Sequence, residues 1–149
     1  MHILVIGAGG MLGAKLLARL GKEGKLGGKA IARVTRYYAV IPPAPPASDY
    51  PVETFVGDLS AAGEPEKLIA GKPDVIFHLA AIVSGEAEKE FEKGYRINLD
   101  ATRILFEVIR KAGGGYKPKV IFTSSIAVFG APFPEAIGDE FFTTPLTSY

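Results

Sequence analysis

Three glycines at regular spacing lie near the start of the chain: Gly7, Gly10 and Gly13. Where a strand turns into a helix, the first such glycine permits the tight turn, the second lets the backbone approach a pyrophosphate, and the third allows helix and sheet to pack closely. The amides of Gly10, Met11 and Leu12 would then point from the helix N-terminus at the phosphates. The loop therefore predicts a dinucleotide site, with a plain strand-to-helix turn as the alternative. No Lys-Ser or Lys-Thr pair follows it, which argues against a triphosphate-binding loop.

The second expected strand lacks the acid that such a site ordinarily has. A carboxylate at the end of this strand usually binds the adenosine ribose, yet no Asp or Glu occurs between Glu23 and Asp49. The residues there include Arg36 and Tyr38. Arg36 could neutralise a ribose 2′-phosphate, which would favour NADP, or it could be a solvated charge at the end of the sheet. NADP therefore stays open beside NAD.

Two further segments end in residues that a nucleotide could contact. Asp58 and Leu59 follow the third apolar run, where the edge of an adenine would lie if the glycine loop holds the pyrophosphate; a turn or helix-capping aspartate is the alternative. His78 closes the fourth run, and we expect it to be packed in the core rather than catalytic. The residues after it would let a flat ligand pass close to the backbone: Leu79, Ala80 and Ala81.

The elements that must position these residues alternate between strands and helices. Five segments predict strands: 2–6, 31–40, 52–56, 74–79 and 120–123. The runs at 2–6 and 74–79 are continuously apolar, as in parallel sheets buried on both faces, and 31–40 is rich in residues that favour strands. Helical periodicity predicts helices over 11–20, 65–70 and 86–111, the last with an apolar stripe from Phe91 to Ile109. Prolines exclude both element types over 41–46. The pattern predicts one α/β domain, 1–149, with a Rossmann-type doubly wound parallel sheet.

Composition limits the remaining function classes. With 48% apolar and 22% charged residues the chain reads as globular, and without cysteine it has no disulfide, thiol or cysteine-zinc chemistry. The two histidines, His2 and His78, lie far apart, so no metal site is expected. A net charge of +1 gives no support to a nucleic acid or membrane-surface partner. No apolar run approaches the ~20 residues that span a bilayer, and a cytoplasmic location is expected.

Taken in order, these motifs resemble those of the extended short-chain dehydrogenases/reductases, the NAD-dependent epimerase/dehydratase family. The resemblance rests on the glycine loop, Asp58–Leu59, 78–81, Asn98 and 124–130. Finer features resemble the members that use NAD to oxidise D-erythronate, a four-carbon sugar acid, to its 2-keto acid; they lie in 83–88, 94–100 and 124–132. A nucleotide-sugar epimerase or dehydratase of the same family, and a non-catalytic dinucleotide-binding module, are the alternatives.

The resemblance implies roles for individual residues. Ser125 would hydrogen-bond the reacting hydroxyl of the substrate, and Tyr149 would be the catalytic base. Asn98 would brace the helix behind the nicotinamide, and Ser84 and Glu86 would shape the substrate pocket. Three more residues would line the nicotinamide end: Ala80, Thr123 and Ser124. Without the resemblance, Ser124-Ser125 reads as a turn at the end of a strand.

The chain departs from the family pattern in two places. The acid of the second strand is replaced around Tyr38, and the family's catalytic lysine, four residues after the tyrosine, would fall beyond Tyr149. The resemblance therefore implies an N-terminal, cofactor-binding part that lacks the later strands and the substrate region and is inactive by itself. A homodimer through the helix from Tyr95 to Ile109 is expected for the whole protein but not for this part.

Overall fold

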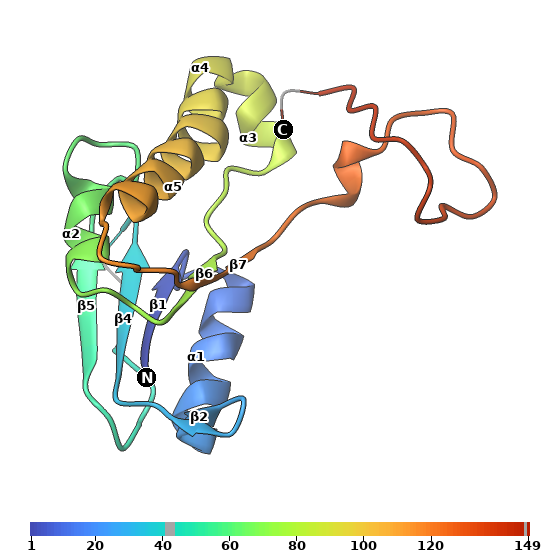
Figure 1. The fold of residues 1–149 in the computed structure, drawn as a ribbon. Helices are drawn as coiled ribbons and strands as arrows, with labels where there is room; N and C mark the ends of the chain where they lie inside the picture. Colours follow the sequence, from blue (N-terminus) through green and yellow to red (C-terminus); the bar gives the residue numbers. More distant parts are fainter. Residues whose placement is uncertain (41–43, 148) are drawn as a thin grey trace.

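The computed structural model describes residues 1–40, 44–147 and 149, in which five parallel strands form one sheet (Figure 1). Its order is β5-β4-β1-β6-β7, with bounds β1 His2–Ile6, β4 Arg33–Tyr38, β5 Val52–Val56, β6 Val75–His78 and β7 Lys119–Phe122. The chain runs from β1 toward one edge and then returns to the other side of β1. This order confirms the predicted Rossmann-type sheet and places a topological switch point at the carboxyl ends of β1 and β6.

The register of the central strand β1 with its neighbours determines where the loops leave the sheet. All five of its residues are buried, as an apolar strand covered on both sides should be. Ile6 pairs with Tyr37 of β4 on one side and with His78 of β6 on the other. Since paired residues lie level, the segments that follow these three strands emerge side by side at one edge of the sheet.

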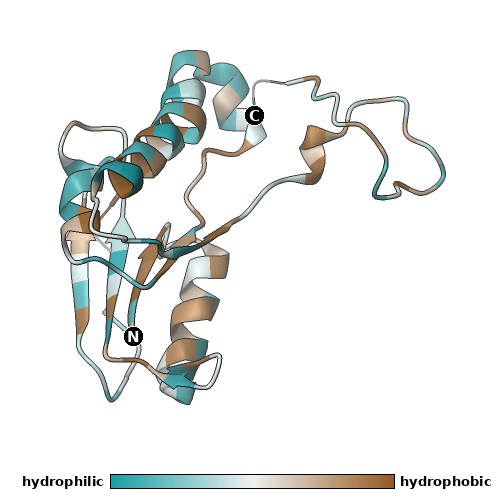
Figure 2. Cartoon of the chain, viewed as in Figure 1, coloured by the Kyte–Doolittle hydropathy of each residue, from teal (hydrophilic) through white to brown (hydrophobic). Residues whose placement is uncertain are grey.

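Helices cover both faces of the sheet: α1 (Met11–Glu23) one face, and α2 (Glu64–Ala70) with α5 (Ala101–Lys111) the other (Figure 1). Alternate residues of β1 serve the two sides, Ile3 and Val5 packing with the α1 cluster and Leu4 and Ile6 with the α2–α5 cluster. In Figure 2 hydrophobic residues are prominent on β1 and on α1, whereas β4 is more hydrophilic. The sheet is thus a rigid platform that carries the loops at its carboxyl edge.

The predicted continuous helix over 86–111 is wrong, because the segment is broken. It contains α3 (Ser84–Lys89), α4 (Phe91–Tyr95), a π-helical turn (Arg96–Asp100) and α5. Glu90 separates the first two pieces with φ −118° and ψ 62°. A π-turn adds a residue to one helical turn and is common at functional sites. The break lets α3 fold back on α4.

The expected apolar stripe of this segment does not face the core. Gly94, Ala101 and Leu105 are buried instead. A Cβ atom at Gly94 would lie 3.1 Å from the Cβ of Ala87, so α3 and α4 approach closely where both residues are small. The stripe residues are largely exposed: Phe91, Tyr95, Leu99 and Phe106. The close approach is confined to Gly94 and Ala87, whereas Leu105 packs into the core and Ile109, the last residue of the stripe, packs against the same cluster.

Two predicted boundaries also differ. The second large strand is β4, 33–38 rather than 31–40, and α1 runs on to Glu23. After α1 the chain forms an unpredicted hairpin of β2 (Lys25–Leu26) and β3 (Lys29–Ala30). Gly27 and Gly28 make its turn with φ of 56° and 78°, which is the two-residue turn that suits a hairpin. The two adjacent glycines are the local turn signal in the sequence for this hairpin.

The predicted loop regions contain little regular structure. Of the proline-rich segment 41–46, residues 41–43 lie outside the described residues, and 44–46 are neither helix nor strand. The end of the chain holds one short 3₁₀ turn (Ile126–Val128) and then an extended arm, 129–147, that projects from the body (Figure 1). Among the described residues, none of the helices is long and apolar enough to cross a membrane.

Candidate functional site

The glycine loop makes a close contact with the end of β6. Gly7 has φ +83°, and its N–H donates to the Tyr37 carbonyl oxygen at 3.1 Å. A Cβ atom at Gly7 would lie 2.6 Å from the Ala80 nitrogen, and one at Gly13 would lie 2.4 Å from the Gly7 carbonyl oxygen. Gly10 is less crowded, because a Cβ atom added there would lie 3.4 Å from its nearest neighbour, the Gly7 carbonyl oxygen. Gly7 thus makes the tight turn and Gly13 the close packing, as their spacing predicts.

The N-terminus of α1 is arranged as an anion would require. Its N-cap, Gly10, offers no side-chain hydrogen bond, and the first turn carries no acidic residue. Met11 and Leu12 are 71% and 55% exposed. The first N–H groups of a helix have no intrahelical acceptor and lie at the positive end of its dipole. The residues present therefore fit a pyrophosphate group.

A crevice of about 490 Å³ opens at the switch point, beside this loop. It is bordered by the carboxyl ends of β1, β4, β5 and β6 and by the α4–π turn. Seven of the predicted cofactor residues line it: Gly7, Gly10, Asp58, Leu59, Leu79, Ala80 and Ala81. Tyr37, Tyr38, Lys93 and Arg96 also line it and were not predicted. Ligands of doubly wound sheets bind at this place.

Asp58 is a turn aspartate that also lines the crevice. Its Oδ1 accepts hydrogen bonds from the Ser60 backbone N–H at 2.9 Å and from the Ser60 hydroxyl, and its Oδ2 accepts from Arg96 at 2.6 Å. Burial opposes ionisation of Asp58, but the hydrogen bonds from Ser60 and Arg96 outweigh it and lower the pKa to about 2. The turn interpretation is confirmed, and a contact between Asp58 and an adenine in the crevice stays a prediction.

Arg36 fits neither of its predicted roles. It is only 4% exposed, so it is not a solvated charge, and it is not among the residues that line the crevice. Its Nε donates to the Thr54 hydroxyl at 2.7 Å and an Nη to the Tyr38 hydroxyl at 3.0 Å. Cross-strand pairing of β4 with β5 directs the guanidinium along the sheet, which the sequence of one strand could not reveal.

A smaller cavity of about 190 Å³ adjoins the crevice, because both are lined by Ala80 and Ala81. It brings together the remaining predicted nicotinamide and catalytic residues: Asn98, Thr123, Ser124, Ser125 and Tyr149. The Ser125 hydroxyl oxygen accepts a hydrogen bond from the Ala127 N–H at 3.1 Å, which leaves its proton for another acceptor. The predicted hydroxyl pair, Ser125 and Tyr149, thus lines one space next to the crevice.

Asn98 holds the segment that separates the two cavities. Its Oδ1 accepts from the Ile82 N–H at 2.9 Å and its Nδ2 donates to the Ile82 carbonyl at 3.0 Å. The π-turn places this amide, and the Thr102 hydroxyl donates to the Asn98 carbonyl at 2.9 Å. Asn98 therefore fixes the loop after β6 as well as the helix behind it, through a partner that no sequence pattern indicated.

His78 is a packed histidine, as expected. It is 1% exposed, its ring lies edge-on to Phe122, and its Nε2 is 2.9 Å from the Thr102 hydroxyl oxygen. The Thr102 hydroxyl donates its proton to the Asn98 carbonyl oxygen, so it can only accept from His78. The neutral His78 ring therefore carries its proton on Nε2. Nδ1 is buried with no partner among the described residues. Burial lowers the pKa of His78 to about 4.

The His78 environment predicts acid-sensitive stability. The unfolded chain binds a proton near the ordinary pKa of 6.5, whereas the folded chain does so near 4. Stability should therefore be full above pH 6.5 and fall by about 3 kcal/mol as the pH approaches 4. Denaturant unfolding at pH 7 and at pH 4.5 measures this loss, and His78→Gln should remove most of it. An equal loss in the variant would contradict the assignment, with His2, whose pKa burial also lowers, as the other candidate.

Two of the predicted substrate residues, Ser84 and Glu86, lie outside both cavities. Ser84 is exposed at the first turn of α3. Glu86 forms an ion pair with Lys93 on the surface, and neither Ser84 nor Glu86 lines the crevice or the smaller cavity. Within the described part of the chain, no group of three or more His, Cys, Asp or Glu is placed to hold a metal ion.

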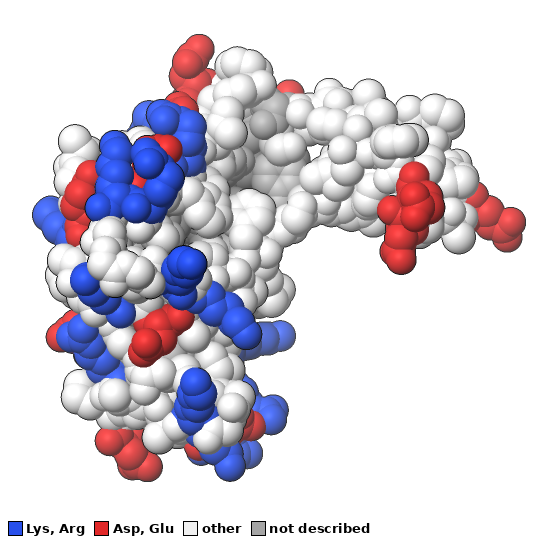
Figure 3. All heavy atoms as spheres, in the orientation of Figure 1, with Lys and Arg blue, Asp and Glu red and all other residues white. Residues whose placement is uncertain are grey.

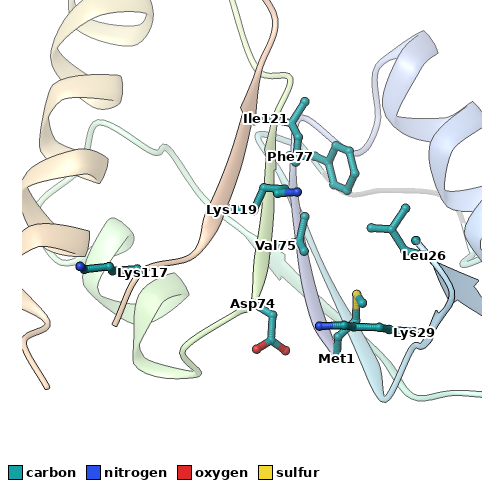
Figure 4. A pocket seen from close by; sticks show the side chains of 10 residues that line it. Met1, Leu26, Lys29, Asp74, Val75, Phe77, Lys117, Lys119 and Ile121 are labelled. Carbon is teal, nitrogen blue, oxygen red and sulfur yellow. The ribbon is translucent and has the colours of Figure 1, made fainter. Parts of the chain in front are cut away.

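A third cavity, of about 830 Å³, lies at the opposite edge of the sheet (Figure 4). Its walls are apolar at Val75, Phe77 and Ile121, and lysines border it. It shares no residue with the other two cavities. Size alone does not make this cavity a reactive site.

The charged side chains are unevenly distributed over the surface. Figure 3 shows Lys and Arg gathered over the body of the molecule, while the charged residues of the projecting arm are acidic, because no Lys or Arg follows Lys119.

Comparison with known proteins agrees with this geometry. Over its whole length the chain is 39% identical to a D-erythronate dehydrogenase of Cupriavidus necator and 34% identical to one of Haemophilus influenzae, covering 46% and 45% of those proteins. The chain thus spans about half the length of the curated relatives it matches.

Solved structures give the same picture. The crystal structure of a nucleoside-diphosphate-sugar epimerase from Agrobacterium tumefaciens matches with a TM-score of 0.96 and 62% identity, over 99% of this chain and 44% of that one. A uronate dehydrogenase from Agrobacterium tumefaciens in complex with NAD matches with a TM-score of 0.74 and 28% identity, over 97% of this chain and 48% of that one. Residues 3–149 match the NAD dependent epimerase/dehydratase family. With a crevice at the switch point and a serine and a tyrosine beside it, the chain belongs to this family.

Proposed function

We propose that this chain is the cofactor-binding part of an NAD-dependent dehydrogenase that oxidises a small sugar acid, D-erythronate, to its 2-keto acid. The observation that carries the proposal is the position of Ser125 and Tyr149 in one cavity that shares Ala80 and Ala81 with the crevice. A dinucleotide that lies along the crevice would bring its nicotinamide to these two hydroxyls. The identity of 39% to a D-erythronate dehydrogenase supports the choice of substrate.

The chain's own residues have defined tasks in this reaction. A bound NAD would supply the hydride acceptor for the carbon that carries the hydroxyl. The Ser125 hydroxyl donates a hydrogen bond to the substrate oxygen and holds it in line with Tyr149. The Tyr149 oxygen takes the hydroxyl proton, so the alcohol loses a hydride from carbon and a proton from oxygen and becomes a ketone. Ala80 and Ala81 leave room for the flat ring, and Asn98 fixes their loop through Ile82.

A nucleotide-sugar epimerase is the second candidate. The similarity to a structure described as a nucleoside-diphosphate-sugar epimerase favours it, at 62% identity. The same serine and tyrosine would oxidise a sugar hydroxyl and then return the hydride, leaving no net oxidation. A non-catalytic dinucleotide-binding module would use the crevice alone. The three possibilities differ in what they do to a substrate rather than in how they hold the cofactor.

Substrate assays on a protein that contains this chain separate these possibilities. We expect D-erythronate and NAD to give NADH, and UDP-glucose and UDP-galactose to give none and not to interconvert. Interconversion of the two nucleotide sugars without NADH would establish the epimerase. Cofactor binding without turnover of any of them would favour the module, and failure of the folded chain to bind any dinucleotide would remove the assignment.

The exposed side of α4 and α5 supports a proposal about assembly. Phe91, Tyr95, Leu99 and Phe106 are exposed there, and the first two rings pack together with centroids 4.8 Å apart. Exposed apolar patches of this kind mark protein interfaces. We propose that the whole protein is a homodimer and that this surface forms its interface. Its ligand would be a small sugar acid, and neither a nucleic acid nor a membrane is proposed as a partner.

A further inference from the structure

We propose that Tyr38 makes the ribose end of the crevice tolerant of a 2′-phosphate, so that the chain binds NADP about as readily as NAD. The inference rests on the proposed cofactor function and deepens it, because it concerns which dinucleotide the crevice accepts. It depends on three observations: the position of Tyr38, the absence of a competing carboxylate, and the charge beneath the tyrosine ring.

Tyr38 lies where the glycine loop meets the second strand. It is the last residue of β4, is 5% exposed, and lines the crevice. A Cβ atom at Gly9 would lie 2.7 Å from Cδ1 and 2.9 Å from Cε1 of its ring, so the ring packs directly against the loop. In dinucleotide-binding folds this strand end carries the acid that binds the ribose 2′-hydroxyl. An apolar ring therefore occupies the position of that carboxylate.

No carboxylate at this end of the crevice takes over the missing role. The crevice-lining residues of the strand end and its loop are Tyr37, Tyr38, Ala39 and Val40. The two nearest acids on the neighbouring segments are already paired, Asp58 with Arg96 and Ser60, and Glu64 with Lys67 and Tyr37. A 2′-phosphate entering here would meet no unpaired negative charge of the kind that excludes NADP elsewhere.

The charge beneath the tyrosine ring is positive. The Arg36 guanidinium carbon lies 5.2 Å from the centre of the Tyr38 ring, and an Nη of Arg36 donates to the Tyr38 hydroxyl. The two cations that line the crevice are themselves paired, Lys93 with Glu86 and Arg96 with Asp58. The charge of Arg36 therefore does not oppose a phosphorylated ribose, and no side chain binds the phosphate directly. We expect tolerance of NADP, not a strong preference for it.

Titration of this chain with NAD and with NADP, followed by calorimetry, tests the inference. The two dissociation constants should agree within about threefold. Tyr38→Asp should weaken NADP relative to NAD by about tenfold or more, while Tyr38→Phe, which keeps the ring, should leave the ratio unchanged. Because Tyr38 is buried, Ala39→Asp at the exposed neighbouring position supplies a second carboxylate that spares the core, with Ala39→Asn as its neutral control.

The outcomes distinguish this inference from the function on which it rests. Binding of NAD with NADP weaker by about tenfold or more in the unaltered chain would overturn the inference and leave the proposed function standing. An unchanged ratio in both aspartate variants would also overturn it. Failure of the folded chain to bind either dinucleotide would overturn both.

Discussion

Replacing Gly13 by alanine is expected to abolish cofactor binding by this chain and to lower its free energy of unfolding by on the order of 4 kcal/mol. The added Cβ would lie 2.4 Å from the Gly7 carbonyl oxygen and 2.7 Å from the Ala8 Cα. Both are backbone atoms, which cannot rotate away as a flexible side chain could. To relieve the clash, α1 would have to move off the sheet, and the anion-binding end of the helix would move with it.

Gly10→Ala is the matched control for this change. Gly10 has φ −70°, and its added Cβ would lie 3.4 Å from the Gly7 carbonyl oxygen, an ordinary contact. This variant should unfold at nearly the denaturant concentration of the unaltered chain but bind NAD more weakly, because its methyl group lies where the pyrophosphate approaches. Circular dichroism during denaturant unfolding and calorimetry with NAD measure the two effects. Equal unfolding midpoints for the two variants would show that Gly13 is not a packing glycine.

Replacing Tyr149 by phenylalanine should lower kcat for sugar-acid oxidation about 10²–10⁴-fold in a protein that contains this chain. The change removes the oxygen that we propose takes the substrate proton, and it keeps the ring that lines the cavity. Binding of NAD should change little, since Tyr149 does not line the crevice. Initial rates of NADH formation and a separate NAD titration give the two quantities.

Tyr95→Phe controls for the loss of a phenol elsewhere. Tyr95 lies at the end of α4, is exposed, and lines neither the crevice nor the smaller cavity, so its variant should retain full activity. Ser125→Ala should also reduce kcat while leaving NAD binding intact. A Tyr149→Phe rate within about threefold of the unaltered protein, well short of a proton-transfer effect, would remove Tyr149 from the mechanism.

The features that could be predicted from the sequence are those with local causes. Apart from one histidine each, β1 and β6 are apolar because both faces of the sheet are covered, so the sequence predicts them as apolar runs. Gly7 and Gly13 were interpretable because a positive φ and a close approach each exclude a side chain. The order of the alternating elements then determined the doubly wound sheet, since few topologies join them.

The errors fall where neighbours in space override neighbours in sequence. The helix over 86–111 is broken because α3 folds back on α4 at Ala87 and Gly94. The residues that it buries are Gly94, Ala101 and Leu105, while most of the predicted apolar stripe is exposed. Arg36 was expected at the sheet end, yet its partners Thr54 and Tyr38 bury it. Neither result follows from the periodicity of a single element.

By itself the sequence determined the fold class, the glycine loop and the set of small and hydroxyl residues that follow the strands. The tertiary structure alone decided which of these residues share a cavity. Ser125 and Tyr149 line the same cavity, Asn98 is hydrogen-bonded to Ile82, and Ser84 and Glu86 lie outside both cavities. The physical reason is that backbone geometry and hydrophobic burial act through short-range patterns. Contacts across the sheet instead depend on strand order and register, which bring together residues that lie far apart in the chain.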